Sequence, residues 1–191
     1  MAGDTGPAWP NGAKVAVSLT FDVDAETGAL GDGPEYARRL TTLSEGRFGV
    51  TRGMPRILAL LAEHGIHGTF FVPGWTAEHH AGLVSSVVAA GHEVGHHGYI
   101  HLRTDKITVD QQRDEIEGGF TALAAAGAPR PVGYRSPVGA RLVDALEGAA
   151  RKQRLLAAVV LGRQGARPAP AASLTAGTPQ RSRTCPASTS M

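Results

Sequence analysis

Two carboxylates stand one residue apart at the end of an alternating apolar run, in the stretch Thr20-Phe21-Asp22-Val23-Asp24. Side chains at positions i and i+2 leave the same face of a strand, so Asp22 and Asp24 point into one space if the strand continues through Val23. Two like charges this close are costly unless a positive charge lies beside them. A metal ion or an arginine would supply that charge, and the sequence therefore predicts a site for one or both here.

Four histidines fall within the ten residues from 92 to 101 and form two His-x-x-x-His pairs, His92 with His96 and His97 with His101. Four-residue spacing on a helical turn is a common way to hold a divalent metal. The residues inside the first pair are strand-like, which separates its members. The second pair follows that strand at its carboxyl end, where parallel-sheet enzymes place their sites. We therefore expect His97 and His101 to share a metal ion with Asp24.

Strand-like and helix-like segments alternate over the first 140 residues. The predicted strands are residues 14–21, 69–72, 92–95 and 132–134, and the main predicted helices are residues 53–64, 83–90 and 109–126. Asp110 is the expected N-cap of the last helix, and Gly127 is its expected end. Repeated strand and helix units of this length predict a parallel sheet, either open or closed as a barrel.

Composition limits the classes of function. A chain of 191 residues with 42% hydrophobic content can bury one core, which predicts a single domain. Residues 1–147 carry 12 Lys and Arg against 17 Asp and Glu, whereas residues 148–191 carry 7 basic residues and no acid. The basic charges are dispersed without interleaved aromatic residues, which argues against nucleic-acid binding.

The chain contains a single cysteine, Cys185, so no internal disulfide forms. The sequence shows no signal-like start and no long apolar run, which favours a cytoplasmic protein with no membrane partner.

Four short stretches resemble, in the right order, the motifs of the polysaccharide deacetylases, the NodB homology domain of carbohydrate esterases. They are Thr20-Phe21-Asp22-Val23-Asp24, Thr69-Phe70-Phe71-Val72, His97-Gly98-Tyr99-Ile100-His101 and Arg135-Ser136-Pro137. The resemblance covers residues 14–139 and implies an α/β fold, here an incomplete version of the family's distorted (β/α) barrel. It also implies hydrolysis of the amide C–N bond of N-acetylated sugars with one divalent metal ion, commonly Zn²⁺, with Co²⁺, Ni²⁺, Fe²⁺ and Mn²⁺ as alternatives.

The same resemblance assigns a role to each site residue. The implied metal ligands are Asp24, His97 and His101. Asp22 is the implied general base, and Arg135 pairs with it and holds it ionised and oriented. The backbone N–H group of Val138 matches the position that donates to the oxyanion in relatives. Two imidazoles and one carboxylate leave an open position on the metal, where a water molecule can bind.

Two departures from the family pattern leave alternatives open. The first departure is Val23, which separates the two acids. This variant resembles a branch of the family that includes peptidoglycan-deacetylase-like proteins and hydrolases of cyclic imides or allantoin. A cytoplasmic amidohydrolase that acts on cyclic imides or allantoin is therefore the first alternative. Relatives also use a late histidine as general acid and a late Asp/Trp motif. No histidine follows His101 and no aromatic residue follows Tyr134. The second alternative is therefore an inactive, truncated fragment that keeps the metal ligands.

These departures lead to three predicted regions: an N-terminal extension at residues 1–13, a partial deacetylase domain at 14–161, and a disordered basic tail at 162–191 that is rich in Ala, Pro, Ser and Arg. The tail is either an ordinary flexible segment or the product of a truncation or a shifted reading frame. An incomplete barrel exposes an unpaired sheet edge, which predicts self-association. The expected partner is otherwise a small-molecule or oligosaccharide amide substrate.

Overall fold

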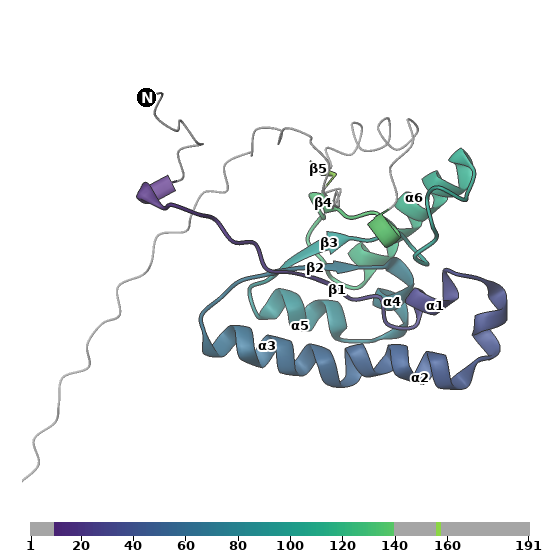
Figure 1. Ribbon diagram of the computed structural model, residues 1–191, viewed down its shortest axis with the longest axis horizontal. Helices are drawn as coiled ribbons and strands as arrows, with labels where there is room; N and C mark the ends of the chain where they lie inside the picture. The colour runs from purple at the N-terminus through teal and green to yellow at the C-terminus, as the bar shows by residue number, and fades with distance from the viewer. Residues whose placement is uncertain (1–9, 140–155, 158–191) are drawn as a thin grey trace, which may run out of the picture. The chain divides into compact units, whose positions relative to one another are not determined.

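The computed structural model describes residues 10–139 and 156–157 (Figure 1). Within these residues five strands form one parallel sheet in the order β1-β2-β3-β4-β5. The strands are β1 (Thr20–Asp22), β2 (Thr69–Val72), β3 (Glu93–His96), β4 (Gly133–Tyr134) and β5 (Leu156–Ala157). A doubly wound sheet reverses its strand order at a switch point, whereas strand order that follows chain order is typical of a (β/α) barrel. The predicted parallel α/β fold is confirmed, and closure into a barrel stays a prediction.

Six α-helices lie in the described part of the chain: α1 (Thr27–Leu30), α2 (Leu40–Phe48), α3 (Met54–Glu63), α4 (Gly74–His79), α5 (Leu83–Ala89) and α6 (Val109–Ala125). A π-helical turn at Gly49–Gly53 joins α2 directly to α3. Short 3₁₀ turns occupy Pro10–Gly12, Pro34–Arg38 and Pro137–Gly139. In Figure 1, α3 and α5 run along the same side of the sheet.

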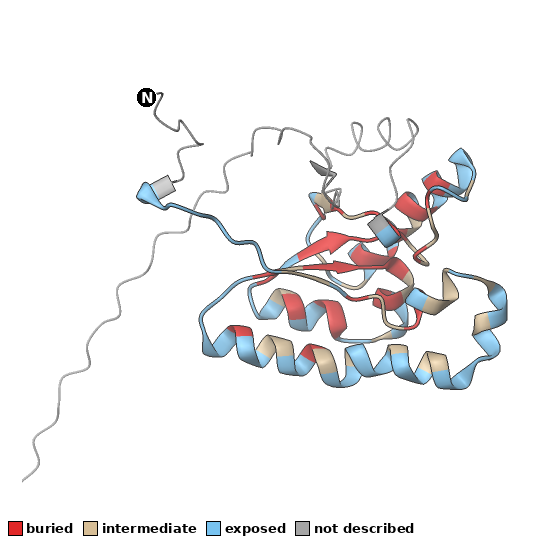
Figure 2. Cartoon of the chain, in the orientation of Figure 1, coloured by how far each residue is buried: buried red, intermediate tan, exposed pale blue. Residues whose placement is uncertain are grey.

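The main core lies on one face of the sheet. Phe70 of β2 has no exposed surface, and it packs with apolar side chains from α3, α5 and α6, among them Leu61, Val87 and Leu123. Figure 2 shows β2 and β3 as mostly buried. Phe21 of β1 stacks on Phe70 with ring centroids 4.9 Å apart. Because side chains alternate across a strand, burying Phe21 on this face sends its neighbours, including Asp22, to the other face.

The opposite face of the sheet is built around Phe71. A Cβ atom at Gly95, on the neighbouring strand, would lie 2.6 Å from Cε1 of Phe71, so only glycine lets the ring lie flat on β3. The guanidinium group of Arg135 lies over this ring, 4.2 Å from its centroid. Phe71 is also the register partner of Asp22. The Phe71 ring therefore lies beneath the guanidinium group of Arg135 and beside the strand position of Asp22.

The first predicted strand was too long. Residues 14–19 were expected to pair, but β1 begins at Thr20, and Val15 and Val17 are 71% and 81% exposed. Thr20 pairs with Thr69, the first residue of β2, and the residues before Thr69 belong to the turn that follows α3. A strand needs a partner for its N–H and C=O groups, and within the described residues this segment has none beyond Leu19.

One helix boundary also differs from prediction. The N-cap of α6 is Thr108 and not Asp110, because Thr108 and Gln111 form a capping box with N···O distances of 3.3 Å and 2.9 Å. Pro73 follows the end of β2 and leads directly into α4. Gly127 follows α6 with φ of 88°, as predicted.

Some predictions fall outside the described residues. The tail at 162–191 lies there, as does the start of the N-terminal extension. Between residues 140 and 161 of the predicted deacetylase domain, only β5 is described. Among the helices in the described ranges, none combines the length and apolar character needed to cross a bilayer.

Candidate metal centre

The carboxyl ends of β1, β3 and β4 converge on a cavity of about 590 Å³. Its lining consists of Thr20, Asp22, Asp24, His97, His101, Arg135, Ser136 and Val138. The structure thus brings together all the site residues that the sequence singled out. Asp22 and Arg135 are more than 110 residues apart in the sequence. They lie in one cavity because a parallel sheet gathers the ends of successive strands at one edge.

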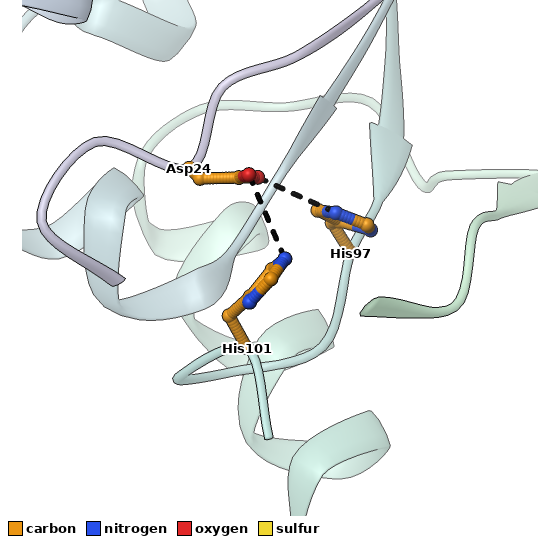
Figure 3. Close-up of side chains that lie close together, drawn as sticks. All are labelled: Asp24, His97 and His101. Carbon is orange, nitrogen blue, oxygen red and sulfur yellow. Dashed lines mark ion pairs between the residues drawn. The ribbon is translucent and has the colours of Figure 1, made fainter. Parts of the chain in front are cut away.

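Asp24, His97 and His101 face one another within this cavity (Figure 3). Nε2 of His97 lies 3.4 Å from Oδ1 of Asp24, and Nε2 of His101 lies 3.6 Å from Oδ2. Each residue offers one ligand atom, and these atoms lie within 4.8 Å of one another. Two ligands at about 2.0–2.1 Å from a tetrahedral metal are roughly 3.3–3.4 Å apart. The observed separations therefore suit a small divalent ion.

Hydrogen bonding around the three residues also fits a metal. Nδ1 of His97 lies 2.7 Å from the carbonyl oxygen of Arg135. Since a carbonyl only accepts, Nδ1 carries a proton, and in the neutral imidazole, the form that binds a metal, Nε2 presents its lone pair to Asp24. Oδ1 of Asp24 is buried and has no hydrogen-bond partner among the described residues. Two acceptors that face each other without a donor are unfavourable, and a divalent cation between them would satisfy both.

The protonation of the site favours the ligand forms. Burial raises the pKa of Asp24, but the imidazoles of His97 and His101 and the Arg135 guanidinium outweigh this effect and hold its pKa below the ordinary value. Burial lowers the pKa of His101, although the Asp24 carboxylate opposes this effect. Metals bind carboxylates and neutral imidazoles, so both shifts favour metal binding near neutral pH.

The loop after β1 is held from several sides, which places Asp24. The carbonyl oxygen of Asp24 accepts from the N–H of Thr27 at 3.0 Å and from the hydroxyl of Thr76 on α4 at 2.9 Å. The buried carboxylate of Glu26 contacts His80 at 2.7 Å and accepts from Arg47 at 3.0 Å. These contacts come from α2, α4 and the residue after α4, so helix packing fixes the loop.

Arg135 and Asp22 form an ion pair at the mouth of the cavity. A second guanidinium nitrogen of Arg135 donates to the hydroxyl of Thr20 at 2.7 Å, and the plane of the group rests on Phe71. The Asp22 side chain remains 38% exposed, so one side of the carboxylate is open to the cavity. Sequence reasoning missed Thr20 and Phe71. The position of Thr20, two residues before Asp22 on the same strand face, was a signal that could have identified it.

Val138 sits in an unusual backbone conformation for a β-branched residue. Its φ of 51° and ψ of 17° lie in the left-handed region, and its side chain is 53% exposed at the cavity. Such conformations cost roughly 1–3 kcal/mol and cluster at functional sites. The predicted use of the Val138 N–H group as a donor to the oxyanion stays a prediction.

The first histidine pair does not join the site, as the sequence predicted. His92 precedes β3 at the other end of the strand, where Gly68 donates to its Nδ1 at 3.4 Å. His96 is fully buried, and its Nε2 lies 2.9 Å from the carbonyl oxygen of Ile116 on α6. Burial lowers the pKa of His96 to about 4, so it is a neutral packing residue at physiological pH.

Gly31 provides the first test of the site geometry. A Cβ atom at Gly31 would lie 2.8 Å from the carbonyl carbon of His101 and 2.8 Å from the oxygen of Ile100. Its φ of −67° suits alanine, so Gly31→Ala acts through steric displacement of His101 alone. We expect zinc affinity in a competitive chelator titration to fall roughly tenfold or more, with about 1–3 kcal/mol of lost stability.

Gly49→Ala is the matched control for this substitution. Nothing lies within 4 Å of a Cβ atom at Gly49, and its φ of −53° is helical. Alanine there should leave zinc affinity unchanged and stability equal or slightly higher. Equal zinc affinity in Gly31→Ala and the unsubstituted chain would show that His101 does not depend on this close approach.

The carboxyl edge of this parallel α/β sheet thus carries an Asp/His/His cluster that could hold a metal ion, beside an arginine-paired aspartate. The sequence matches the polysaccharide deacetylase family over residues 10–154. The chain belongs to this family, whose members hydrolyse amide C–N bonds and are metal-dependent.

Individual relatives agree with this assignment. The chain is 31% identical to a peptidoglycan deacetylase of Helicobacter pylori over 129 residues, which are 65% of this chain and 42% of that protein. A candidate polysaccharide deacetylase structure from Mycobacterium smegmatis matches with a TM-score of 0.76 and 37% identity over 81% of this chain and 54% of that one. A family 4 carbohydrate esterase from Streptomyces lividans, solved with acetate, matches with a TM-score of 0.56 and 27% identity over 74% and 60%. The chain thus spans about two fifths of the curated relative and just over half of each structure.

Proposed function

We propose that the chain carries the metal site and the general base of a deacetylase that hydrolyses the acetamido group of N-acetylated sugars in peptidoglycan or a related polysaccharide. The observation that carries this proposal is the placement of Asp24, His97 and His101 beside an arginine-held Asp22 in one cavity. Support comes from the peptidoglycan deacetylase of Helicobacter pylori and from the Streptomyces lividans esterase that was solved with acetate, the acid product of such a reaction.

Asp24, His97 and His101 would hold the metal in this proposal. Two imidazole nitrogens and one carboxylate, with ligand atoms within 4.8 Å of one another, are a donor set that favours Zn²⁺. When bound, such an ion would supply Lewis-acid polarisation and lower the pKa of a coordinated water towards about 7. Asp22 lines the same cavity as these three residues.

The remaining chemistry falls to the side chains and backbone of this chain. Asp22 accepts a proton from the attacking water as the water oxygen bonds to the amide carbonyl carbon. Arg135 holds the Asp22 carboxylate in place at the cavity, and the N–H of Val138 donates to the carbonyl oxygen as it gains negative charge. The C–N bond then breaks, the nitrogen takes up the proton that Asp22 holds, and a free amine leaves together with acetic acid, which releases its proton to water to give acetate.

The proposal is tested by measuring bound metal and product together on the purified chain. We expect one zinc ion per chain by atomic emission and acetate release from N-acetylated chito-oligomers or peptidoglycan. Absence of stoichiometric metal would contradict the proposal. Stoichiometric metal without any product would indicate a fragment that retains the metal site without turnover, and hydrolysis confined to a cyclic imide panel would identify the other amide substrate class.

A further inference from the structure

A buried carboxylate with no role in the proposed chemistry lies behind the metal site. Glu115, in the middle of α6, is only 6% exposed and is followed by the core residue Ile116. Glutamate is seldom buried to this extent unless its charge is compensated. The partners of Glu115 are backbone N–H groups, and these belong to the short loop that carries His97 and His101.

The contacts of Glu115 span almost the whole segment between the two histidines. Its carboxylate accepts from the N–H of Tyr99 at 2.9 Å and from the N–H of Ile100 at 3.2 Å, with a longer contact to the N–H of Leu102 at 3.4 Å. One side chain on α6 therefore gathers three N–H groups from four consecutive residues. Such a concave set of N–H groups is an anion-binding shape, and here the anion belongs to the protein itself.

The backbone of the loop explains why it needs such an anchor. Gly98 and His101 both have left-handed conformations, with φ of 80° and 64°. A non-glycine residue keeps that conformation only where its surroundings enforce it. Oε2 of Glu115 would lie 2.8 Å from a Cβ atom at Gly98, so the carboxylate is seated directly against the turn. The left-handed bend at His101 is what returns its imidazole towards Asp24, 3.6 Å away.

A second side chain on the same face of α6 extends this anchoring. Gln112 lies one turn before Glu115, is 2% exposed, and donates from Nε2 to the carbonyl oxygen of Thr104 at 2.8 Å. Residues three apart share a helix face, so α6 presents a polar pair to the loop where an ordinary packing helix would present apolar residues. The pair binds the backbone on both sides of His101.

We propose that Glu115 is a positioning residue for the metal site, which fixes the backbone of residues 98–102 so that His97 and His101 meet Asp24. This inference rests on the proposed metal site, and it adds a residue that touches neither metal nor substrate. Ligand orientation by surrounding hydrogen bonds typically changes metal affinity by 10- to 100-fold.

Glu115→Gln tests the proposal with little change of size. The amide replaces one acceptor oxygen by a donor that cannot bind the loop N–H groups. We expect zinc affinity in a chelator competition to fall roughly 10- to 100-fold. Amide hydrogen exchange at Tyr99, Ile100 and Leu102 in the metal-free chain should become roughly tenfold faster or more. The visible absorption of the Co²⁺-substituted protein should change in intensity, because it reports ligand geometry.

Glu117→Gln is the matched control, because Glu117 lies on the same helix with its side chain in solvent. It should match the unsubstituted chain in zinc affinity, exchange and Co²⁺ spectrum. If Glu115→Gln does not fold, Glu115→Asp retains the charge with a shorter reach, and an intermediate loss of zinc affinity is then expected. Zinc affinity and loop exchange within twofold of the unsubstituted chain in every folded Glu115 variant would overturn the proposal.

The two proposals fail in different ways. If the unsubstituted chain binds no zinc, the proposed function fails, while the exchange comparison in the metal-free chain still decides whether Glu115 orders the loop. If zinc binds normally and Glu115→Gln changes neither affinity nor exchange, the positioning role fails and the proposed function stands.

Discussion

Asp22→Asn is expected to leave zinc bound and to lower kcat for amide hydrolysis by roughly 10²- to 10⁴-fold, the usual range for loss of a general base. Asparagine has nearly the shape of aspartate but cannot accept a proton from water at neutral pH. Asp22 lies in the cavity and is paired with Arg135, but it is not among the three clustered ligand residues. The loss should therefore appear in kcat and not in metal content.

The measurement combines steady-state kinetics of acetate release with zinc analysis of the same preparation. Asp114→Asn is a suitable control, since Asp114 is exposed on α6 and away from the cavity lining. It should show unchanged kcat and zinc content. An Asp22→Asn variant that keeps more than about a tenth of kcat would exclude Asp22 as the base, and one that loses its zinc would move Asp22 into the ligand set.

Replacing a metal ligand should remove the zinc itself, whereas replacing Asp22 should leave the zinc bound. His97→Ala is expected to lower zinc affinity by more than about 100-fold, beyond the range seen for residues that only orient ligands. His97 is 2% exposed and directs Nε2 at Asp24, so the substitution removes a ligand and leaves the carboxylate without its partner. Hydrolysis should be lost together with the metal.

Thermal unfolding provides an independent measurement of the same loss. A ligand at 100 times its Kd stabilises a folded protein by about 2.7 kcal/mol, so zinc should raise the Tm of the unsubstituted chain and a chelator should lower it. The Tm of His97→Ala should respond to neither. His64→Ala, at an exposed histidine outside the cavity, should behave like the unsubstituted chain. A full zinc-dependent rise in Tm for His97→Ala would contradict the proposed ligand set.

Much of the site was predictable because its spacing is local. β1 ends at Asp22, so the strand does not continue to Asp24 as the two-residue period required, but the two acids are so close along the chain that both lie at the carboxyl end of β1 and line the cavity. The position of His97 and His101 after β3 follows from the rule that parallel sheets gather strand ends at one edge. The fold class followed in the same way from the alternation of strands and helices.

Residues that act across long sequence distances were not predictable from spacing. Thr20 meets Arg135 across 115 positions, and Gly31 meets the backbone of His101 only because the loop before α2 folds against the histidine loop. Glu115 lies within the helix predicted at residues 109–126, and no motif in the sequence singled it out. Its burial depends on how α6 packs against the loop, and no local pattern encodes that arrangement.

By itself, the sequence determined which residue types stand at each strand end, and therefore that a carboxylate pair and a histidine pair share one edge of a parallel sheet. Only the tertiary structure decided that Asp22 pairs with Arg135 while Asp24 faces His97 and His101. Backbone periodicity fixes the direction of a side chain within its own element. Which residues a side chain contacts depends on the other elements that pack beside its own element. The contacts of Phe71 with Arg135 and of Glu115 with the histidine loop are examples.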